Sequence, residues 1–159
     1  MTVHGRVTTG RADPGPVVAN AGLVVADLGV TPAIRRSRWA AMDDLTRAGV
    51  CRLRGQEGDG LDGGGHVEHL WVPDVDGPVC YLRLVRRPGV EASIDLLATA
   101  PDVASLGVLS VLLLDVVARY GADPLVVTGR DQPGELLQRY GFAPDGPGRR
   151  RRAPEAPWR

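Results

Sequence analysis

The feature that most constrains the fold of this chain is a heavily apolar segment, residues 105–120, which Gly121 follows. Its aliphatic side chains recur at the spacing of an α-helix and cover most of the helix circumference. Among them are Val108, Leu109, Val111, Leu112, Leu113, Val116 and Val117. Such a helix cannot face water on a broad side, so we expect it to be buried against a β-sheet and to end at Gly121.

The segments around this helix predict an alternation of strands and helices. Short apolar or β-branched runs between turn formers indicate strands, and longer apolar periods indicate helices. In chain order we expect a strand over 22–28, a helix over 32–47 that Gly49 ends, a mobile glycine-rich loop over 55–65, a hairpin of strands 69–72 and 79–85, a strand over 92–99, the helix over 105–120, a strand over 125–128, a short helix over 134–139 and a last strand after Phe142. This order predicts an α/β fold with a mixed, mostly antiparallel sheet flanked by helices.

Length and composition favour one domain. The chain has 159 residues, and its aromatic content of 4% means that Val, Leu and Ala must build the core. We place the domain at residues 19–146. The residues expected in its core are Val25, Leu70, Val79, Leu82, Leu84, Leu96, Leu112, Val116, Val126 and Val127.

The charge balance and the lack of long apolar runs argue against nucleic acid and membranes as partners. Nineteen basic and nineteen acidic residues cancel, so no overall field favours nucleic acid or an anionic membrane surface. No apolar run approaches the roughly 18 residues needed to span a bilayer, and the first residues lack the apolar stretch of a signal peptide. We therefore expect a cytoplasmic protein whose partner is a small molecule, with no membrane contact.

Both ends of the chain are predicted to be tails. Residues 1–18 are rich in Gly, Thr, Arg and Pro without a period, which is typical of a flexible segment. Residues 147–159 combine turn formers with the run Arg149–Arg152 and are expected to be solvated. The alternative for this run is an arm that binds anions, since adjacent guanidinium groups suit phosphates.

The cysteine and histidine pattern gives no sign of a metal site. Cys51 and Cys80 are far apart and form no Cys-x-x-Cys pair, which favours two buried thiols over a disulfide or a nucleophile. His66, Glu68 and His69 lie close in sequence, but no further Cys or carboxylate ligands accompany them. We expect no metal ion.

Several short motifs in this order resemble the GCN5-related N-acetyltransferase (GNAT) superfamily and, within it, the small ElaA-like branch. The motifs are His69–Trp71, the stretch Asp76–Leu84 with its Tyr-Leu-Arg-Leu, Ala100-Pro101 before the long helix, and Arg139–Phe142 with its Gly-Phe. The resemblance covers about residues 66–146. It implies a GNAT-like domain that binds acetyl-CoA or another acyl-CoA.

The resemblance also implies where the coenzyme would bind. The strand residues Leu97, Ala98 and Thr99 would pair with the pantetheine amide, and a loop at the start of the long helix would hold the pyrophosphate on its backbone N–H groups. That loop corresponds here to Ser105, Leu106, Gly107, Val108 and Leu109. Of the family's glycine pattern only Gly107 is kept, and Leu109 stands where Gly or Ala is expected.

The family's usual proton donor is also missing. Leu136-Leu137 replaces the customary Phe-Tyr pair, so the tyrosine that protonates the departing thiolate is absent. Water or a neighbour such as Tyr140 would then take the role of acid.

Two carboxylates are candidates for a general base. Asp95 is a charged residue in the middle of a strand, and alternation sends it to the face opposite Ile94 and Leu96. If that face lines a cleft, Asp95 can accept a proton; otherwise it is solvated or paired with an arginine. Glu68, beside His66 and His69, is the second candidate and would act through a water relay. The alternative is that these three residues are only the polar start of a strand.

Three functions follow from these observations. The leading one is an enzyme that transfers an acyl group from a coenzyme A thioester to a small-molecule amine. The second is proton-transfer or cyclisation chemistry on a specialised-metabolite intermediate, without acetyl-CoA, in a repurposed and degenerate site with Asp95 or Glu68 as base. The third is a non-catalytic module that binds a small molecule, with a homodimer formed through exposed sheet edges.

Overall fold

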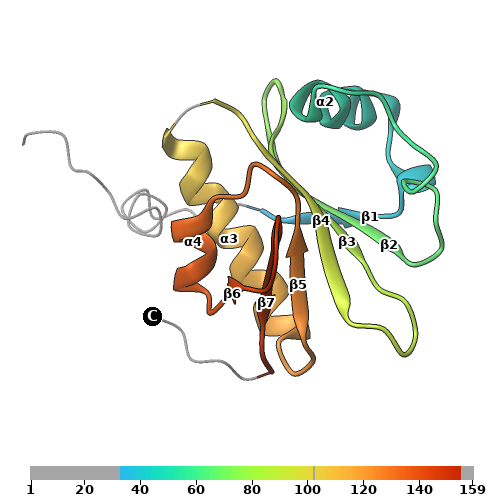
Figure 1. The fold of residues 1–159 in the computed structure, drawn as a ribbon. Helices are drawn as coiled ribbons and strands as arrows, with labels where there is room; N and C mark the ends of the chain where they lie inside the picture. The colour runs from blue at the N-terminus through green and yellow to red at the C-terminus, as the bar shows by residue number, and fades with distance from the viewer. Residues whose placement is uncertain (1–32, 102, 155–159) are drawn as a thin grey trace, which may run out of the picture.

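The computed structural model describes residues 33–101 and 103–154 and has an α/β architecture (Figure 1). Its helical elements are the 3-10 helix η1 (Trp39–Ala41), α2 (Asp44–Arg54), α3 (Val103–Tyr120) and α4 (Gly134–Arg139). Its strands are β1 (Arg35–Ser37), β2 (Val67–Asp74), β3 (Gly77–Val85), β4 (Ala92–Thr99), β5 (Leu125–Thr128), β6 (Ala143–Pro144) and β7 (Arg149–Arg152). The predicted strand over 22–28, the N-terminal tail and Val25 lie outside the described residues.

Within the described residues one sheet of seven strands runs in the order β1-β2-β3-β4-β5-β7-β6. All neighbouring strands are antiparallel except β4 and β5, which are parallel. The helix α3 makes the crossover between these two strands, as the chain order β4-α3-β5 requires. This confirms the predicted fold class and the mostly antiparallel sheet.

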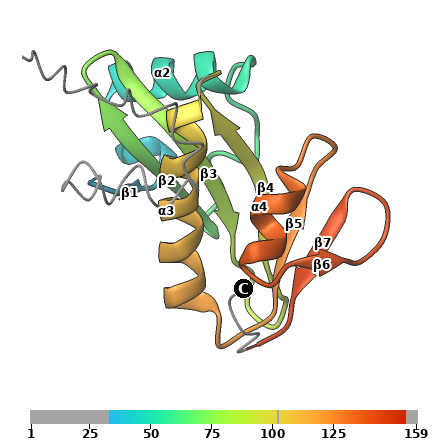
Figure 2. The same ribbon diagram turned by 90° about the vertical axis from the view of Figure 1, so that its left-hand side faces the viewer.

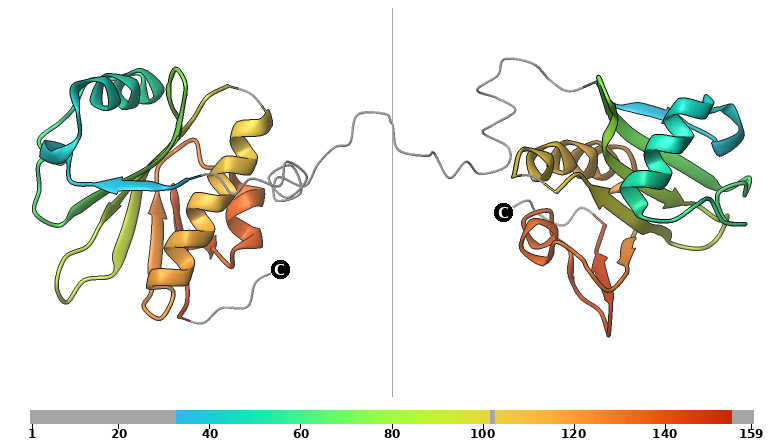
Figure 3. Two further views of the ribbon diagram at one scale, coloured as in Figure 1. Left: turned by 180° about the vertical axis from the view of Figure 1, so that it is seen from behind. Right: turned by 90° about the horizontal axis from the view of Figure 1, so that it is seen from above.

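Helices cover both faces of the sheet. Figures 2 and 3 show α3 and α4 on one face and α2 on the other. The α3 side holds the larger core cluster, in which Leu112, Leu113 and Val116 are fully buried. The α2 side holds a smaller cluster that includes Trp71 and Tyr81. The expectation that the apolar helix is buried on a sheet is therefore confirmed.

Most of the predicted core is buried. Leu70, Leu82, Leu84, Leu112, Val116, Val126 and Val127 are each at most 1% exposed. Val79 and Leu96 are half-buried at the edges of the two clusters. The hairpin, the strand over 92–99, the strand over 125–128 and the helix over 134–139 are confirmed, with longer hairpin strands and a tighter turn than expected.

The predicted helix over 32–47 is wrong. The chain instead forms the edge strand β1, the short helix η1 and then α2, which starts only at Asp44. Asp43 caps α2, because its carboxylate accepts the N–H of Thr46 at 2.8 Å and the Thr46 hydroxyl at 2.8 Å. This cap and the pairing of β1 with β2 outweigh the apolar stripe that suggested one longer helix.

Gly49 does not end the helix. It lies inside α2, where a side chain would come within 2.5 Å of Pro78 Cδ, so the glycine permits close packing on the hairpin. The helix ends at Gly55, whose φ of 70° is the left-handed conformation typical of a helix C-terminus. The sequence signal was therefore a packing glycine, not a terminator.

The predicted solvated tail over 147–159 is also partly wrong, because Arg149–Arg152 forms β7. This strand pairs antiparallel with β5 and extends the domain beyond residue 146. Arg152 is 2% exposed, and its Nε donates to the carbonyl of Tyr140 at 2.9 Å. Arg149 and Arg151 form ion pairs with Glu91. A strand in the sheet therefore replaces the expected tail, and three of the four guanidinium groups have internal partners.

A bulge in β4 sets the geometry of the region between β4 and β5. Arg83 of β3 lies opposite Leu96, whereas the next residue, Leu84, lies opposite Ile94, so Asp95 is the extra residue. Alternation had predicted that Ile94 and Leu96 share one face of the sheet. Because of the bulge they do not: Ile94 packs on the α3 side and Leu96 on the α2 side.

Replacing Arg152 by Met should lower the free energy of unfolding by about 2 kcal/mol, because the buried carbonyl partners lose a charged donor. Those partners include the carbonyls of Tyr140 at 2.9 Å and Gly121 at 3.3 Å. The neighbouring change Arg151→Met should cost much less, since Arg151 is exposed and reaches only Glu91, at 3.6 Å. Urea unfolding of both variants checks this, and equal losses would contradict the structural role of Arg152.

Candidate functional site

A groove opens where β4 and β5 separate. The two strands pair only between Ala92–Ile94 and Leu125–Val127, and the bulge at Asp95 follows immediately. Beyond this point lies a cavity of about 390 Å³ on the α3 side of the sheet. It is lined by Leu97, Thr99, Leu109, Asp131, Gln132 and Pro133. The strand ends, the start of α3 and the loop after β5 thus meet at one place.

The backbone of β4 offers free hydrogen-bonding groups to this groove. The Ala100 N–H donates to the Val79 carbonyl at 2.9 Å, and Tyr81 lies opposite Ala98, so both Ala100 and Ala98 face β3. By alternation the N–H and C=O groups of Leu97 and Thr99 face away from β3, toward the groove. Of the three predicted cofactor residues, Leu97 and Thr99 line the groove, and the Ala98 side chain packs on the α2 side.

The helix α3 reaches the groove at Leu109, in its second turn. Ser105 and Leu106 belong to the first turn of this helix, whose leading N–H groups have no partner inside the helix. Leu109 lines the groove but is only 2% exposed and is part of the α3-side core. Its side chain, which departs from the family pattern, is therefore accommodated by the core. Gly107 is buried and Val108 is half-buried.

The loop after β5 forms the opposite wall, and sequence reasoning missed it. The side-chain amide of Gln132 donates to the carbonyls of Gly129 and Gly148, both at 2.9 Å, and so ties the loop to the turn before β7. Asp131 and Pro133 line the groove beside it. One signal was available: these residues directly follow the carboxyl end of a buried parallel strand, where ligand-binding loops gather.

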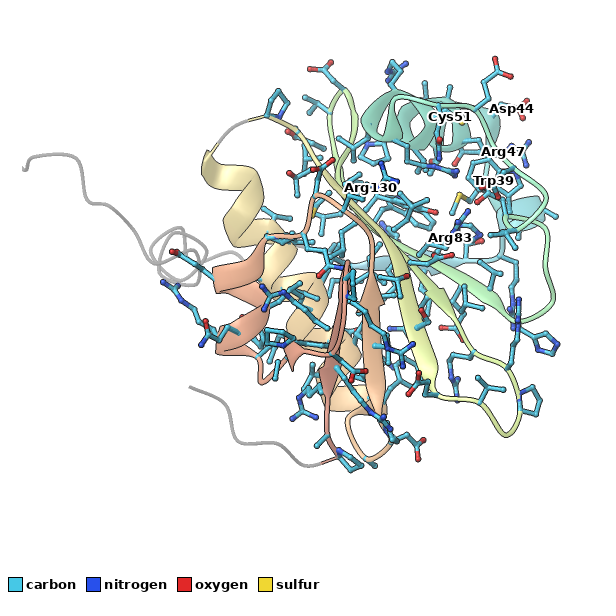
Figure 4. All side chains as sticks on the ribbon, viewed as in Figure 1. Trp39, Asp44, Arg47, Cys51, Arg83 and Arg130 are labelled. Carbon is cyan, nitrogen blue, oxygen red and sulfur yellow. The ribbon has the colours of Figure 1, made fainter. Side chains whose placement is uncertain are left out.

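Asp95 is ion-paired on the α2 side of the sheet, where Figure 4 shows Arg83. Arg83 Nε and Nη2 donate to the two carboxylate oxygens of Asp95 at 2.9 and 3.1 Å. Arg83 Nη1 donates to Asp62 at 2.7 Å. Although burial opposes the charge on Arg83, its hydrogen bonds to Asp95 and Asp62 raise its pKa. Of the two outcomes foreseen for Asp95, the structure therefore has the arginine pair.

Asp62 anchors the glycine-rich loop that was expected to be mobile. Its carboxylate is 2% exposed and accepts hydrogen bonds from Arg54, Arg83 and the Asp59 N–H. Burial alone would raise the pKa of Asp62, but the bonds from Arg54 and Arg83 outweigh burial, and the pKa falls below its usual value. The loop is thus fixed to the sheet by a buried charge.

His69 is a buried partner of this loop. Its Nε2–H donates to the Asp62 carbonyl at 3.1 Å, so Nδ1 carries no proton and accepts the Tyr81 hydroxyl at 2.7 Å. Burial lowers the pKa of His69 and raises the pKa of Tyr81. Both ring nitrogens are occupied, so this histidine has no free position for a water relay to Glu68.

Glu68 and Tyr140 do not line the groove. Glu68 accepts the hydroxyl of Tyr120, the last residue of α3, at 3.0 Å. Since Leu109 lies eleven residues earlier on that helix, Glu68 is displaced by roughly 16 Å along the helix from the groove. Tyr140 packs at the edge of the α3-side core, and its hydroxyl is hydrogen-bonded to Ser110. Leu137, at the position of the family's tyrosine, is fully buried.

The described residues also include two cysteines. Cys51 and Cys80 are free, and burial raises the pKa of the Cys80 thiol to about 12. Across residues 33–101 and 103–154, no three His, Cys, Asp or Glu side chains are grouped as ligands for a metal ion. In the same residues no helix is long and apolar enough to cross a membrane.

No protein-family model matches the chain, and no curated protein matches it. Solved structures do. An acyl-CoA N-acyltransferase from Pseudomonas aeruginosa has 21% identity and a TM-score of 0.64, with 77% of this chain and 100% of that chain covered. Escherichia coli ElaA has 15% identity and a TM-score of 0.62, with 76% of this chain and 99% of that chain covered.

The E. coli protein YhhK, whose solution structure has coenzyme A bound, has 14% identity and a TM-score of 0.61. The match covers 78% of this chain and 100% of that chain. At such identities the likeness concerns the fold alone. The chain has the fold of the GCN5-related N-acetyltransferases.

Proposed function

We propose that the protein is an N-acyltransferase that moves an acyl group, such as acetyl, from a coenzyme A thioester to a small-molecule amine. The observation that carries this proposal is the groove between β4 and β5, into which the free backbone groups of Leu97 and Thr99 face. Proteins of the same fold support it: one is described as an acyl-CoA N-acyltransferase, and another was solved with coenzyme A.

The groove suits the two ends of the cofactor. An extended pantetheine arm carries amide groups that can pair with Leu97 and Thr99, as an added strand would. Its phosphates can meet the first turn of α3, where unpaired N–H groups and the helix dipole favour negative charge. Neither interaction needs a particular side chain, so the loss of the family's glycine pattern at Leu109 leaves both available.

The transfer itself requires little from side chains at this site. The amine nitrogen attacks the thioester carbonyl, the carbon–sulfur bond breaks, the nitrogen loses a proton and the thiolate gains one. The Asp95 carboxylate is committed to Arg83, and the Tyr140 hydroxyl is committed to Ser110. We therefore assign the acceptance and the supply of protons to water in the open groove, with the amine arriving uncharged.

The alternative of proton-transfer or cyclisation chemistry without acyl-CoA needs Asp95 or Glu68 as a free base in a cleft. Asp95 lines a cavity of about 270 Å³ and Glu68 lines another of about 820 Å³, but both carboxylates already have partners. Asp95 is held in a two-point bond to Arg83, and Glu68 lies beside the far end of α3. A module that binds without transfer remains as an outcome of the tests below.

Coenzyme A should bind the wild-type protein, and Thr99→Trp should weaken that binding about tenfold or more, because the larger ring fills the groove that Thr99 lines. The matched control is Val75→Trp, at the exposed turn between β2 and β3, which should bind as the wild type does. Isothermal titration calorimetry measures both, and thermal unfolding verifies that the variants fold. If the wild type gives no heat of binding at millimolar coenzyme A, the proposed use of acyl-CoA is wrong.

Turnover should follow binding. Incubation with acetyl-CoA and a panel of small amines, analysed by mass spectrometry, should show a product heavier by one acetyl group. Tyr140→Phe should keep kcat within about threefold of wild type, because the Tyr140 hydroxyl is hydrogen-bonded to Ser110 and does not line the groove. A loss of about a hundredfold would assign Tyr140 as the proton donor, and binding without any product would indicate a binding module.

A further inference from the structure

We propose that Arg83 is a positioning residue that holds the bulge in β4 and thereby keeps the acyl-CoA groove open. This inference rests on the proposed function. Arg83 itself lies on the α2 side of the sheet and does not line the groove. It acts through Asp95, the extra residue of the bulge, and through Asp62 of the glycine-rich loop.

The contacts of Arg83 use the fork shape of its guanidinium group. One edge, Nε and Nη2, bonds both oxygens of Asp95 at 2.9 and 3.1 Å. The other nitrogen, Nη1, bonds Asp62 at 2.7 Å and Asp59 at 3.1 Å. The Arg83 side chain is only 5% exposed and that of Asp62 only 2%, so the bond between them is shielded from water, whereas Asp95 and Asp59 are partly accessible. A single rigid group thus fixes the bulge and the loop relative to each other.

We call the contacts of Arg83 with Asp95 and Asp62 the clamp. The clamp lies at the one place where the register of β3 and β4 changes. Arg83 is the last residue before the shift, and Asp95 is the residue that the shift leaves without a partner across the strand pair. The two-point ion pair between Arg83 and Asp95 therefore joins the two residues that define the bulge.

The bulge in turn determines the groove. Without the extra residue, β4 would continue in regular register beyond Ile94. Its free backbone edge at Leu97 and Thr99 would then be able to pair further with β5, which now stops pairing at Val127. Pairing of this kind would consume the backbone groups that the proposed cofactor needs. A residue that stabilises the bulge therefore keeps the backbone groups of Leu97 and Thr99 available to the cofactor.

The glycine-rich loop is part of the same assembly. Asp62 is buried between Arg83 and Arg54, and it accepts hydrogen bonds from both. Arg54 is fully buried, and its Nε and Nη2 have no hydrogen-bond partner among the described residues. Burying the three charges of Arg54, Arg83 and Asp62 at one place is costly, and apolar residues of similar volume would stabilise the fold equally well. We attribute the cluster to positioning for this reason.

The test uses the full chain with Arg83→Lys, which keeps the charge but loses the fork, and with Asp95→Asn as a second variant. Arg86→Lys is the matched control, because Arg86 follows β3 directly and lies outside the cluster. The probe is coenzyme A, titrated by calorimetry. Hydrogen exchange, followed by mass spectrometry, reports separately on residues 96–99 of β4 and on residues 112–117 of α3.

We expect Arg83→Lys to weaken coenzyme A binding about tenfold and to speed exchange over residues 96–99, with the exchange of α3 unchanged. Arg86→Lys should match wild type in both measurements. If Arg83 had a purely structural role, Arg83→Lys would lower the unfolding temperature. At a temperature where this variant is folded, its coenzyme A affinity and its hydrogen exchange over residues 96–99 would then match wild type. Wild-type affinity in Arg83→Lys overturns the proposal.

Two further outcomes are decisive. If Arg83→Lys does not fold, Asp95→Asn takes its place, and wild-type affinity in that variant overturns the proposal. If the wild type itself does not bind coenzyme A, the proposed function fails, and hydrogen exchange alone decides on the clamp. Unchanged exchange over residues 96–99 in a folded variant then overturns the role of Arg83.

Discussion

The candidate site depends on the early end of the pairing between β4 and β5. Parallel strands that continued side by side would satisfy each other's backbone groups and leave no groove. Here the ladder ends at Ile94 and Val127, directly before the bulge residue Asp95. The hydrogen-bonding groups left free are backbone groups in a region where the sheet is otherwise complete, and a ligand is the natural partner for them.

The burial of α3 fixes the other half of the site. Because most faces of this helix are apolar, it packs across one face of the sheet, against β2, β3 and β4. That position brings its first turns to the end of the groove. The same packing explains the departures from the family pattern: Leu109 and Leu137 are both buried in the α3-side core. They contribute to the stability of the fold at positions where the resemblance implied glycine or alanine and tyrosine.

The sequence predicts the middle of this fold well and its two ends poorly. The strands from the hairpin to Thr128 and the helix α3 carry strong apolar patterns between clear turn residues, and their predicted bounds are close to the observed ones. The helix expected over 32–47 fails because a cap at Asp43 and an edge strand decide the local structure. The strand Arg149–Arg152 is invisible to apolar periodicity, since its arginines are satisfied by carbonyls and carboxylates from distant segments. The groove is predictable only in part, because Gln132 and the bulge take their roles from strand register.

Binding and transfer depend on different parts of this protein. Cofactor binding would rest on backbone groups of β4 and α3, which tolerate changes of side chain as long as the bulge and the helix position persist. Rapid transfer would benefit from an acid at the thiolate, and the position that supplies it in the family is here the buried Leu137. The proposed function therefore relies on the backbone groups for binding and assigns the supply of the proton to water. Under the proposed function, the rate of transfer would be set by the access of water and amine to the open groove.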